Sequence, residues 1–70
     1  MTKKEMIQAI QVAEAQAWKD YRIARKVMGD DDSITAKRRS EWCAVYDLRE
    51  ALGIESMSVE SLMKKDLIVA

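Results

Sequence analysis

The residues that could carry out chemistry in this chain are few, and histidine is not among them. Without an imidazole, a catalytic triad or dyad of the Ser-His-Asp or Cys-His type cannot be assembled. Cys43 is the only cysteine, and it stands between Trp42 and Ala44 with no flanking base to activate its thiol. We therefore interpret Cys43 as a small apolar residue, and we expect no enzymatic activity.

The acidic run Asp30-Asp31-Asp32-Ser33 has the right chemistry for a cation. If Asp30 takes the first position of a calcium loop, Glu41 falls at the twelfth, as in an EF-hand. Thr35, however, stands where that loop requires glycine. Acidic residues also favour helix N-termini, so we interpret the run as a helix cap. A zinc site needs about four cysteine or histidine ligands, so we expect no metal and no other cofactor.

Cationic residues gather on both sides of residues 29–33, which raises nucleic-acid binding as an alternative function. These candidate contacts are Arg22, Arg25, Lys26, Lys37, Arg38 and Arg39. Residues 19–41 hold seven cations against five anions, and the whole chain carries twelve of each. An excess of two is small beside the roughly six to ten phosphate contacts of a duplex binder. A weak nucleic-acid-binding or regulatory protein therefore stays the second hypothesis.

Gly29 and Gly53 divide the chain into helical segments, and the chain has no proline that would interrupt a helix. Thr2-x-x-Glu5 has the form of a capping box, which predicts a first helix over about 3–28. Gly29 tolerates the left-handed conformation of a C-cap. The acidic run then caps a second helix over about 33–52. Gly53 ends it, and Ile54 is placed to fold back in a Schellman-type contact.

Apolar residues recur at spacings of three and four in both segments, which is typical of amphipathic helices. The predicted stripe of the first helix is Met6, Ile10, Ala13, Ala17, Tyr21, Ala24 and Met28, and that of the second is Ile34, Glu41, Val45, Leu48 and Leu52. A short connection makes the helices antiparallel, so we expect the two stripes to face each other. The same register places Trp18 level with Trp42, and Glu14 near Arg49 as a cross-helix ion pair.

The chain is expected to form one all-α domain over residues 1–70, with the hairpin in residues 1–53. Residues 54–70 are predicted to add a short helix around Leu62, and the apolar end Leu67–Ala70 is expected to pack beside the N-terminal half of the first helix. No apolar run approaches the roughly 18 residues of a membrane span, and the N-terminus lacks the apolar core of a signal peptide. A cytoplasmic location is expected.

Self-association is predicted because a chain of this length buries only about 60% of its unfolded surface. Small scaffolds usually add disulfides, a metal or a second subunit, and the first two are excluded here. We expect a homo-oligomer, a dimer forming a helical bundle, although an unidentified protein partner stays open.

The aromatic residues either seal the edge of the hairpin or form a partner interface. Val12 and Ile23 lie on the opposite side of the first helix from its stripe, which indicates that more than one face is covered. The candidate partner interface consists of Val12, Trp18, Tyr21, Ile23, Trp42 and Tyr46.

Four segments carry a resemblance to a known group of proteins. They are Met1–Met6, the Trp18-x-x-Tyr21 step, the turn Gly29–Ser33 and the stretch Trp42–Asp47. Over residues 1–52 the chain resembles small uncharacterised helical proteins of bacterial prophages and mobile elements. The resemblance implies a small accessory role and assigns no site residues. The leading hypothesis is a non-enzymatic protein–protein interaction or accessory module that acts through a self-associating helical hairpin.

Overall fold

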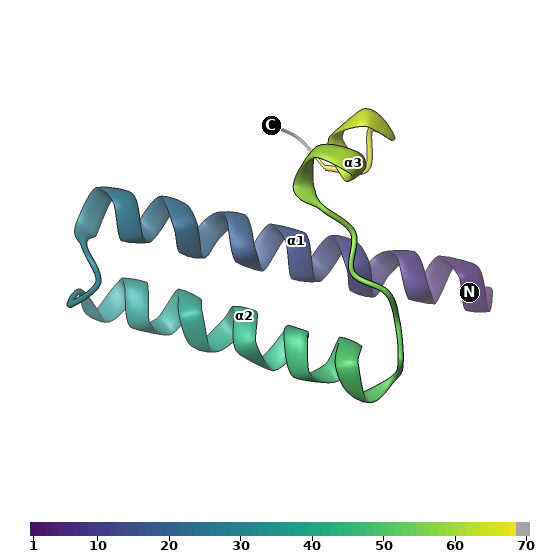
Figure 1. Cartoon of the computed structure of the whole chain (residues 1–70), viewed down its shortest axis with the longest axis horizontal. Helices are drawn as coiled ribbons and strands as arrows, with labels where there is room; N and C mark the ends of the chain where they lie inside the picture. Colours follow the sequence, from purple (N-terminus) through teal and green to yellow (C-terminus); the bar gives the residue numbers. More distant parts are fainter. Residues whose placement is uncertain (69–70) are drawn as a thin grey trace.

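The computed structural model describes residues 1–68, and these form three helices joined by short connections (Figure 1). Helix α1 spans Lys3–Met28, α2 spans Ser33–Ala51 and α3 spans Val59–Lys64. The first two make an antiparallel hairpin, and α3 lies on the side of α1 that faces away from α2 (Figure 1). The all-α hairpin with a short third helix is thus confirmed, with bounds within a residue of those expected for both long helices.

Side-chain caps explain where the long helices begin. The Thr2 hydroxyl accepts a hydrogen bond from the Glu5 N–H at 3.1 Å and donates to the Glu5 carboxylate at 3.1 Å. At the start of α2, the Asp32 carboxylate accepts from the Ile34 N–H at 2.8 Å. Both caps satisfy backbone donors that have no partner within the helix. The acidic run is therefore used as a helix cap, as its sequence indicates.

The two glycines end the long helices in different ways. Gly53 has φ 68° and is followed by a Schellman motif, in which the Ile54 N–H donates to the Arg49 carbonyl at 3.1 Å. Gly29 has φ 88° and ψ 165°, so the expected left-handed cap is wrong at this position. Its extended ψ directs the Gly29 carbonyl towards Asp32, whose N–H donates to it at 3.5 Å. This bond closes the turn that starts α2.

The seam between α1 and α2 is rotated from the predicted one. Tyr21 and Ala24 of the predicted stripe are buried, as expected. On α2, however, the buried residues are Thr35 and Arg49, whereas Ile34, Leu48 and Leu52 are 44%, 51% and 55% exposed. The prediction that the two apolar stripes face each other is therefore wrong in large part. The physical reason is the size of the side chains. Indole and phenol rings fill the seam between two helices and bury more area than the alanines of the predicted stripe do.

The C-terminal segment packs onto α1 and builds a second small core. Leu62 is fully buried, and it clusters with Ala15 and Ile68. Val12 of α1 packs against the same cluster, so the segment docks on the N-terminal half of α1, as predicted. Residues 69–70 of the predicted apolar end lie outside the described residues.

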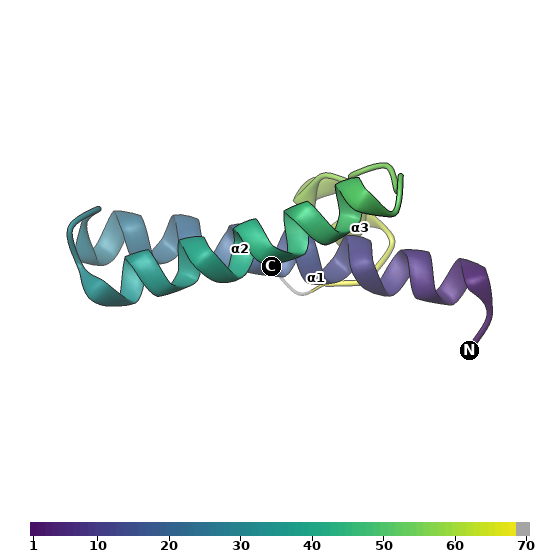
Figure 2. The ribbon, with the colours of Figure 1, turned by 90° about the horizontal axis from the view of Figure 1, so that it is seen from below.

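The molecule is elongated, with principal extents of 39 × 26 × 17 Å (Figure 2). The long direction is that of the hairpin, and the C-terminal segment adds width near its middle (Figures 1 and 2). Within the described residues, no helix has both the length and the apolar character needed to cross a bilayer.

Candidate protein interaction surface

A buried ion pair ties the two long helices together near the open end of the hairpin. The Nε atom of Arg49 donates to the Glu14 carboxylate, and both side chains are buried. The same guanidinium donates to the Ile54 carbonyl at 2.8 Å and contacts the Glu50 carboxylate at 3.5 Å. The predicted cross-helix pair is thus confirmed, and its environment is buried.

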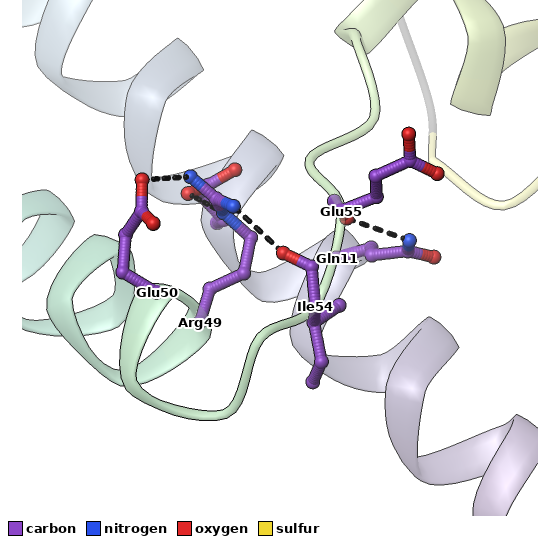
Figure 3. A network of polar contacts seen from close by, with 6 residues as sticks. Gln11, Arg49, Glu50, Ile54 and Glu55 are labelled. Atoms are coloured by element: carbon purple, nitrogen blue, oxygen red, sulfur yellow. Dashed lines mark hydrogen bonds and ion pairs between the residues drawn. The ribbon is translucent and has the colours of Figure 1, made fainter.

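This network serves to position elements. Arg49 uses its planar fork to join α1, α2 and the connection after Gly53 (Figure 3). Gln11 adds a second link, because its side-chain amide donates to the Glu55 carbonyl at 2.8 Å. The Glu14 carboxylate raises the pKa of Arg49 above its ordinary value, so the guanidinium stays charged. The network therefore fixes the path of residues 54 and 55 across the hairpin.

The four aromatic rings occupy one side of the seam. The centroids of Trp18 and Trp42 are 4.7 Å apart, which confirms that the two residues lie at the same height. Tyr21 stacks on Trp42 with centroids 6.1 Å apart and ring planes inclined by 10°. Tyr46 extends the row, 5.7 Å from Trp42. Of the two interpretations of these residues, the sealing of the hairpin edge describes the contacts observed.

The other two residues of the candidate interface have separate environments. Val12 is half-buried against the C-terminal segment, so the chain itself covers the side of α1 on which Val12 lies. Ile23 is exposed and lies between two grooves, one beside Val59 and Met63 of α3 and one between α1 and α2 that Ile34 also lines. The expectation that more than one face of the first helix is covered is met by the C-terminal segment.

The six cations of the alternative nucleic-acid site are divided among different sides of the hairpin. The guanidinium of Arg22 lies 6.0 Å from the Trp18 ring, and that of Arg25 lies 5.6 Å from the Tyr21 ring. Arg38 forms an ion pair with Glu41 at 3.1 Å and borders a different groove. Arg22 and Lys26 line the same groove beside α3, and Lys37 and Arg39 are exposed. The structure does not bring all six together around one groove.

One face of the hairpin carries the displaced apolar stripe. Two shallow grooves of about 300 Å³ and 210 Å³ run along it between α1 and α2, and Asp20 and Arg38 line both. We call this surface the open face. The grooves are lined by Ala13, Gln16, Ala17, Asp20, Ile23, Ala24, Val27 and Met28 of α1, with Ile34, Arg38 and Glu41 of α2. Leu48 continues the seven-residue row of Ile34 and Glu41, and Leu52 lies one turn beyond it, so we include these two exposed residues in the open face. The C-terminal segment lines neither groove, since it packs against α1 at Val12 and Ala15.

Sequence reasoning found the residues of the open face but assigned them to the wrong contact. Each helix carries two adjacent rows with a seven-residue repeat. Rows through Glu14 and Tyr21 on α1, and through Thr35, Trp42 and Arg49 on α2, form the seam. The neighbouring row on α2 passes through residues 34, 41 and 48 and reaches the open face. Apolar periodicity does not mark the seam rows, because they pass through Glu14, Thr35 and Arg49 as well as through aromatic residues.

Within the described residues, no three side chains of the histidine, cysteine or acidic types are grouped as metal ligands would be. A cavity of about 340 Å³ lies between the aromatic rings and residues 56–60. Its polar lining is made of arginine, glutamate and serine side chains, and Arg49 and Glu14 within it are paired with each other. The open face is therefore the candidate interaction surface of this protein.

Comparisons with protein-family models, with curated proteins and with solved structures found no match to this chain.

Proposed function

We propose that this protein is a non-enzymatic interaction module that acts by self-association of its hairpin through the open face. The observation that supports the proposal is the exposed row on α2, where Ile34, Leu48 and Leu52 are each about half exposed. Val27 and Met28 extend this apolar surface onto α1. Single exposed apolar residues are ordinary on a monomer, whereas grouped ones mark interaction sites, and here Val27, Met28 and Ile34 line one groove together.

The accessible surface of the chain supports an interface of ordinary size. It measures 5161 Å². A compact folded monomer of 8.0 kDa is expected to expose about 4,450 Å². The excess, roughly 700 Å², is close to the ~800 Å² that each partner buries in a standard protein interface. A second copy packed on the open face would remove an excess of this size.

The small core supports the same proposal. The buried apolar residues of the described part are Ala15, Tyr21, Ala24, Leu62 and Ile68, and two of these are alanines. A scaffold of this length generally needs an additional source of stability. An internal disulfide cannot supply it, because Cys43 is the single cysteine. Two hairpins packed together would form a four-helix bundle with a shared core.

The proposed setting is the cytoplasm, where a lone thiol such as the exposed Cys43 stays reduced. An accessory role, of the kind implied by the resemblance to prophage proteins, is compatible with a module that has only an association surface. The basic residues near the turn are spread over several sides of the hairpin, so they give the nucleic-acid hypothesis no additional support.

Sedimentation velocity of two matched variants tests the proposal. Leu48→Asp places a charge in the open face, whereas Cys43→Asp places the same charge at another exposed position of α2. We expect the unaltered protein and Cys43→Asp to sediment as dimers at micromolar concentration, and Leu48→Asp to sediment as a monomer with helical circular dichroism retained. If Leu48→Asp associates as strongly as Cys43→Asp does, the open face is not the interface.

A further inference from the structure

We infer that the cavity between the aromatic rings and residues 56–60 binds a small aromatic anion, with the ring of the ligand against Trp18 and Trp42 and its acidic group at Arg22. We call this space the aromatic cavity. It shares no lining residue with the two grooves of the open face. The inferred site is therefore separate from the proposed surface of self-association.

The walls of the aromatic cavity have the composition of a small-molecule site. Trp18 of α1 and Trp42 and Tyr46 of α2 supply the rings, and residues 56–60 supply the facing segment of the chain. Both tryptophans are only half-buried, so their rings keep surface that a ligand could cover. The volume of about 340 Å³ falls within the range of about 300–1,000 Å³ that is typical of ligand pockets. A cavity of this size suits a ligand of roughly one or two fused rings.

The segment that closes the cavity is held in place on both sides of it. The connection that enters the cavity is fixed by two hydrogen bonds of 2.8 Å, which the carbonyls of Ile54 and Glu55 accept. Beyond Ser56, Met57 and Val59 pack against the small core that contains Leu62. Both anchors exist without a ligand, so the cavity is preformed, as most small-molecule sites are.

Arg22 lies where the aromatic cavity meets a second groove of about 360 Å³, because it lines both. Lys19 and Lys26 also line the second groove, so it has three cations against one carboxylate, that of Glu60. In the described part of the chain, Arg22 takes part in no ion pair, and its guanidinium lies 6.0 Å from the Trp18 ring. A guanidinium binds a carboxylate through two parallel hydrogen bonds. Arg22 is therefore placed to bind an acidic group attached to a ring that lies on Trp18.

The opposite end of the cavity does not favour an anion. Arg49 is bound to the Glu14 carboxylate there and contacts the Glu50 carboxylate at 3.5 Å, so two carboxylates surround one guanidinium. A ligand cation would need an open ring face, but the Arg49 guanidinium already lies 5.0 Å from the centre of the Tyr46 ring. The charges thus favour an aromatic anion over an aromatic cation, and they orient its acidic group towards Arg22.

Two-dimensional ¹H–¹⁵N NMR with naphthalene-2-carboxylate tests the site. The chain has two tryptophans and both line the cavity, so both indole N–H signals report on it. We expect both signals to shift saturably with naphthalene-2-carboxylate, and with much lower affinity for naphthalene-2-carboxamide, which has the same rings without the charge. No saturable shift up to millimolar ligand would overturn the inference, and so would equal affinities for the acid and the amide.

Matched variants test where the ligand lies. Arg22→Gln removes the cation at the junction, whereas Arg39→Gln removes an exposed cation that lines neither the cavity nor the second groove. We expect the Kd of naphthalene-2-carboxylate to rise about tenfold in Arg22→Gln and to stay unchanged in Arg39→Gln. Ser56→Phe puts a ring into the cavity and should abolish binding with helical circular dichroism retained.

Two results of these variants would contradict the inferred site. Equal losses of affinity in the two arginine variants would overturn the placement of the acidic group at Arg22. Unchanged binding to Ser56→Phe would place the ligand outside the aromatic cavity. Sedimentation of the same samples reports on self-association separately, because neither arginine lines a groove of the open face.

Discussion

Thr35 and Arg49 are the two buried polar residues of α2, and they differ in how their polar atoms are satisfied. The guanidinium of Arg49 has partners on Glu14, Glu50 and Ile54. The hydroxyl oxygen of Thr35 has no hydrogen-bond partner, although the residue is 2% exposed. A buried polar atom without a hydrogen-bond partner destabilises the folded state, whereas one whose hydrogen bonds are satisfied stabilises it. The two positions should therefore respond in opposite ways to loss of their polar groups.

We expect Thr35→Val to stabilise the protein by about 1 kcal/mol, because valine keeps the shape of threonine and removes the unsatisfied hydroxyl. The free energy of unfolding in urea, measured at one protein concentration, checks this. Thr35→Ser is the matched control, since it keeps the hydroxyl, removes the methyl group and should destabilise. A loss of stability in Thr35→Val would mean that the hydroxyl has a partner in solution.

We expect Arg49→Lys to lower Tm by at least about 8 °C, because an ammonium group cannot reproduce the fork that binds Glu14 and the Ile54 carbonyl. Arg38→Lys changes an exposed pair with Glu41 in the same chemical way and should leave Tm nearly unchanged. Thermal unfolding followed by circular dichroism compares the two variants. Equal decreases in Tm would show that Arg49 stabilises the protein through its charge alone and not through the geometry of its hydrogen bonds.

Tyr46 gives the protein an alkaline pH dependence. The Glu50 carboxylate accepts a hydrogen bond from the phenol and repels the phenolate, so it raises the pKa of Tyr46 above its ordinary value of 10.0. The unfolded chain then loses this proton first, so the stabilisation is present below pH 10 and is lost as the pH rises through the folded pKa. We expect tyrosinate absorbance to develop at lower pH in Glu50→Gln than in the unaltered protein. Identical titrations would show that Glu50 does not act on Tyr46.

At the scale of elements, the helix ends are set by short-range chemistry, and Gly29 is the most constrained position among them. Its φ of 88° and ψ of 165° fall in a region that residues with a side chain essentially never adopt. Gly53, at φ 68°, is in a region that asparagine also visits. The hairpin turn should therefore tolerate substitution less well than the end of α2 does.

We expect Gly29→Ala to destabilise the hairpin by roughly 1–3 kcal/mol through backbone strain, since nothing lies within 4 Å of the added methyl group. Gly53→Asn should cost less than Gly29→Asn, because asparagine accepts the left-handed conformation. Urea unfolding of the three variants provides the comparison. A neutral Gly29→Ala would indicate that the turn adopts another conformation in solution.

Features that depend on neighbouring residues could be predicted from the sequence, whereas the packing between the helices could not. The caps at Thr2 and Asp32 and the Schellman motif at Gly53 depend on a few neighbouring residues, and each was predictable. The pairings of Trp18 with Trp42 and of Glu14 with Arg49 followed from counting along two antiparallel helices. The rotation of the seam did not, because each helix has two rows that could face the other, and the choice depends on how whole side chains fill the space.

At the scale of the whole molecule, the protein is long and its core is thin. Its radius of gyration is 12.7 Å, against about 11 Å for a compact domain of this length. The residues that would thicken the core, among them Leu48 and Leu52, lie exposed on the open face. A second hairpin on this face would bury them and make the assembly more compact for its mass. Self-association is therefore the property on which the proposed function depends.

Sedimentation equilibrium of the unaltered protein from low to high micromolar concentration tests this property most directly. We expect the mass to rise towards twice 8.0 kDa and to reach a plateau there, because a two-fold interface closes after two copies. A mass of 8.0 kDa at every concentration would contradict the proposal.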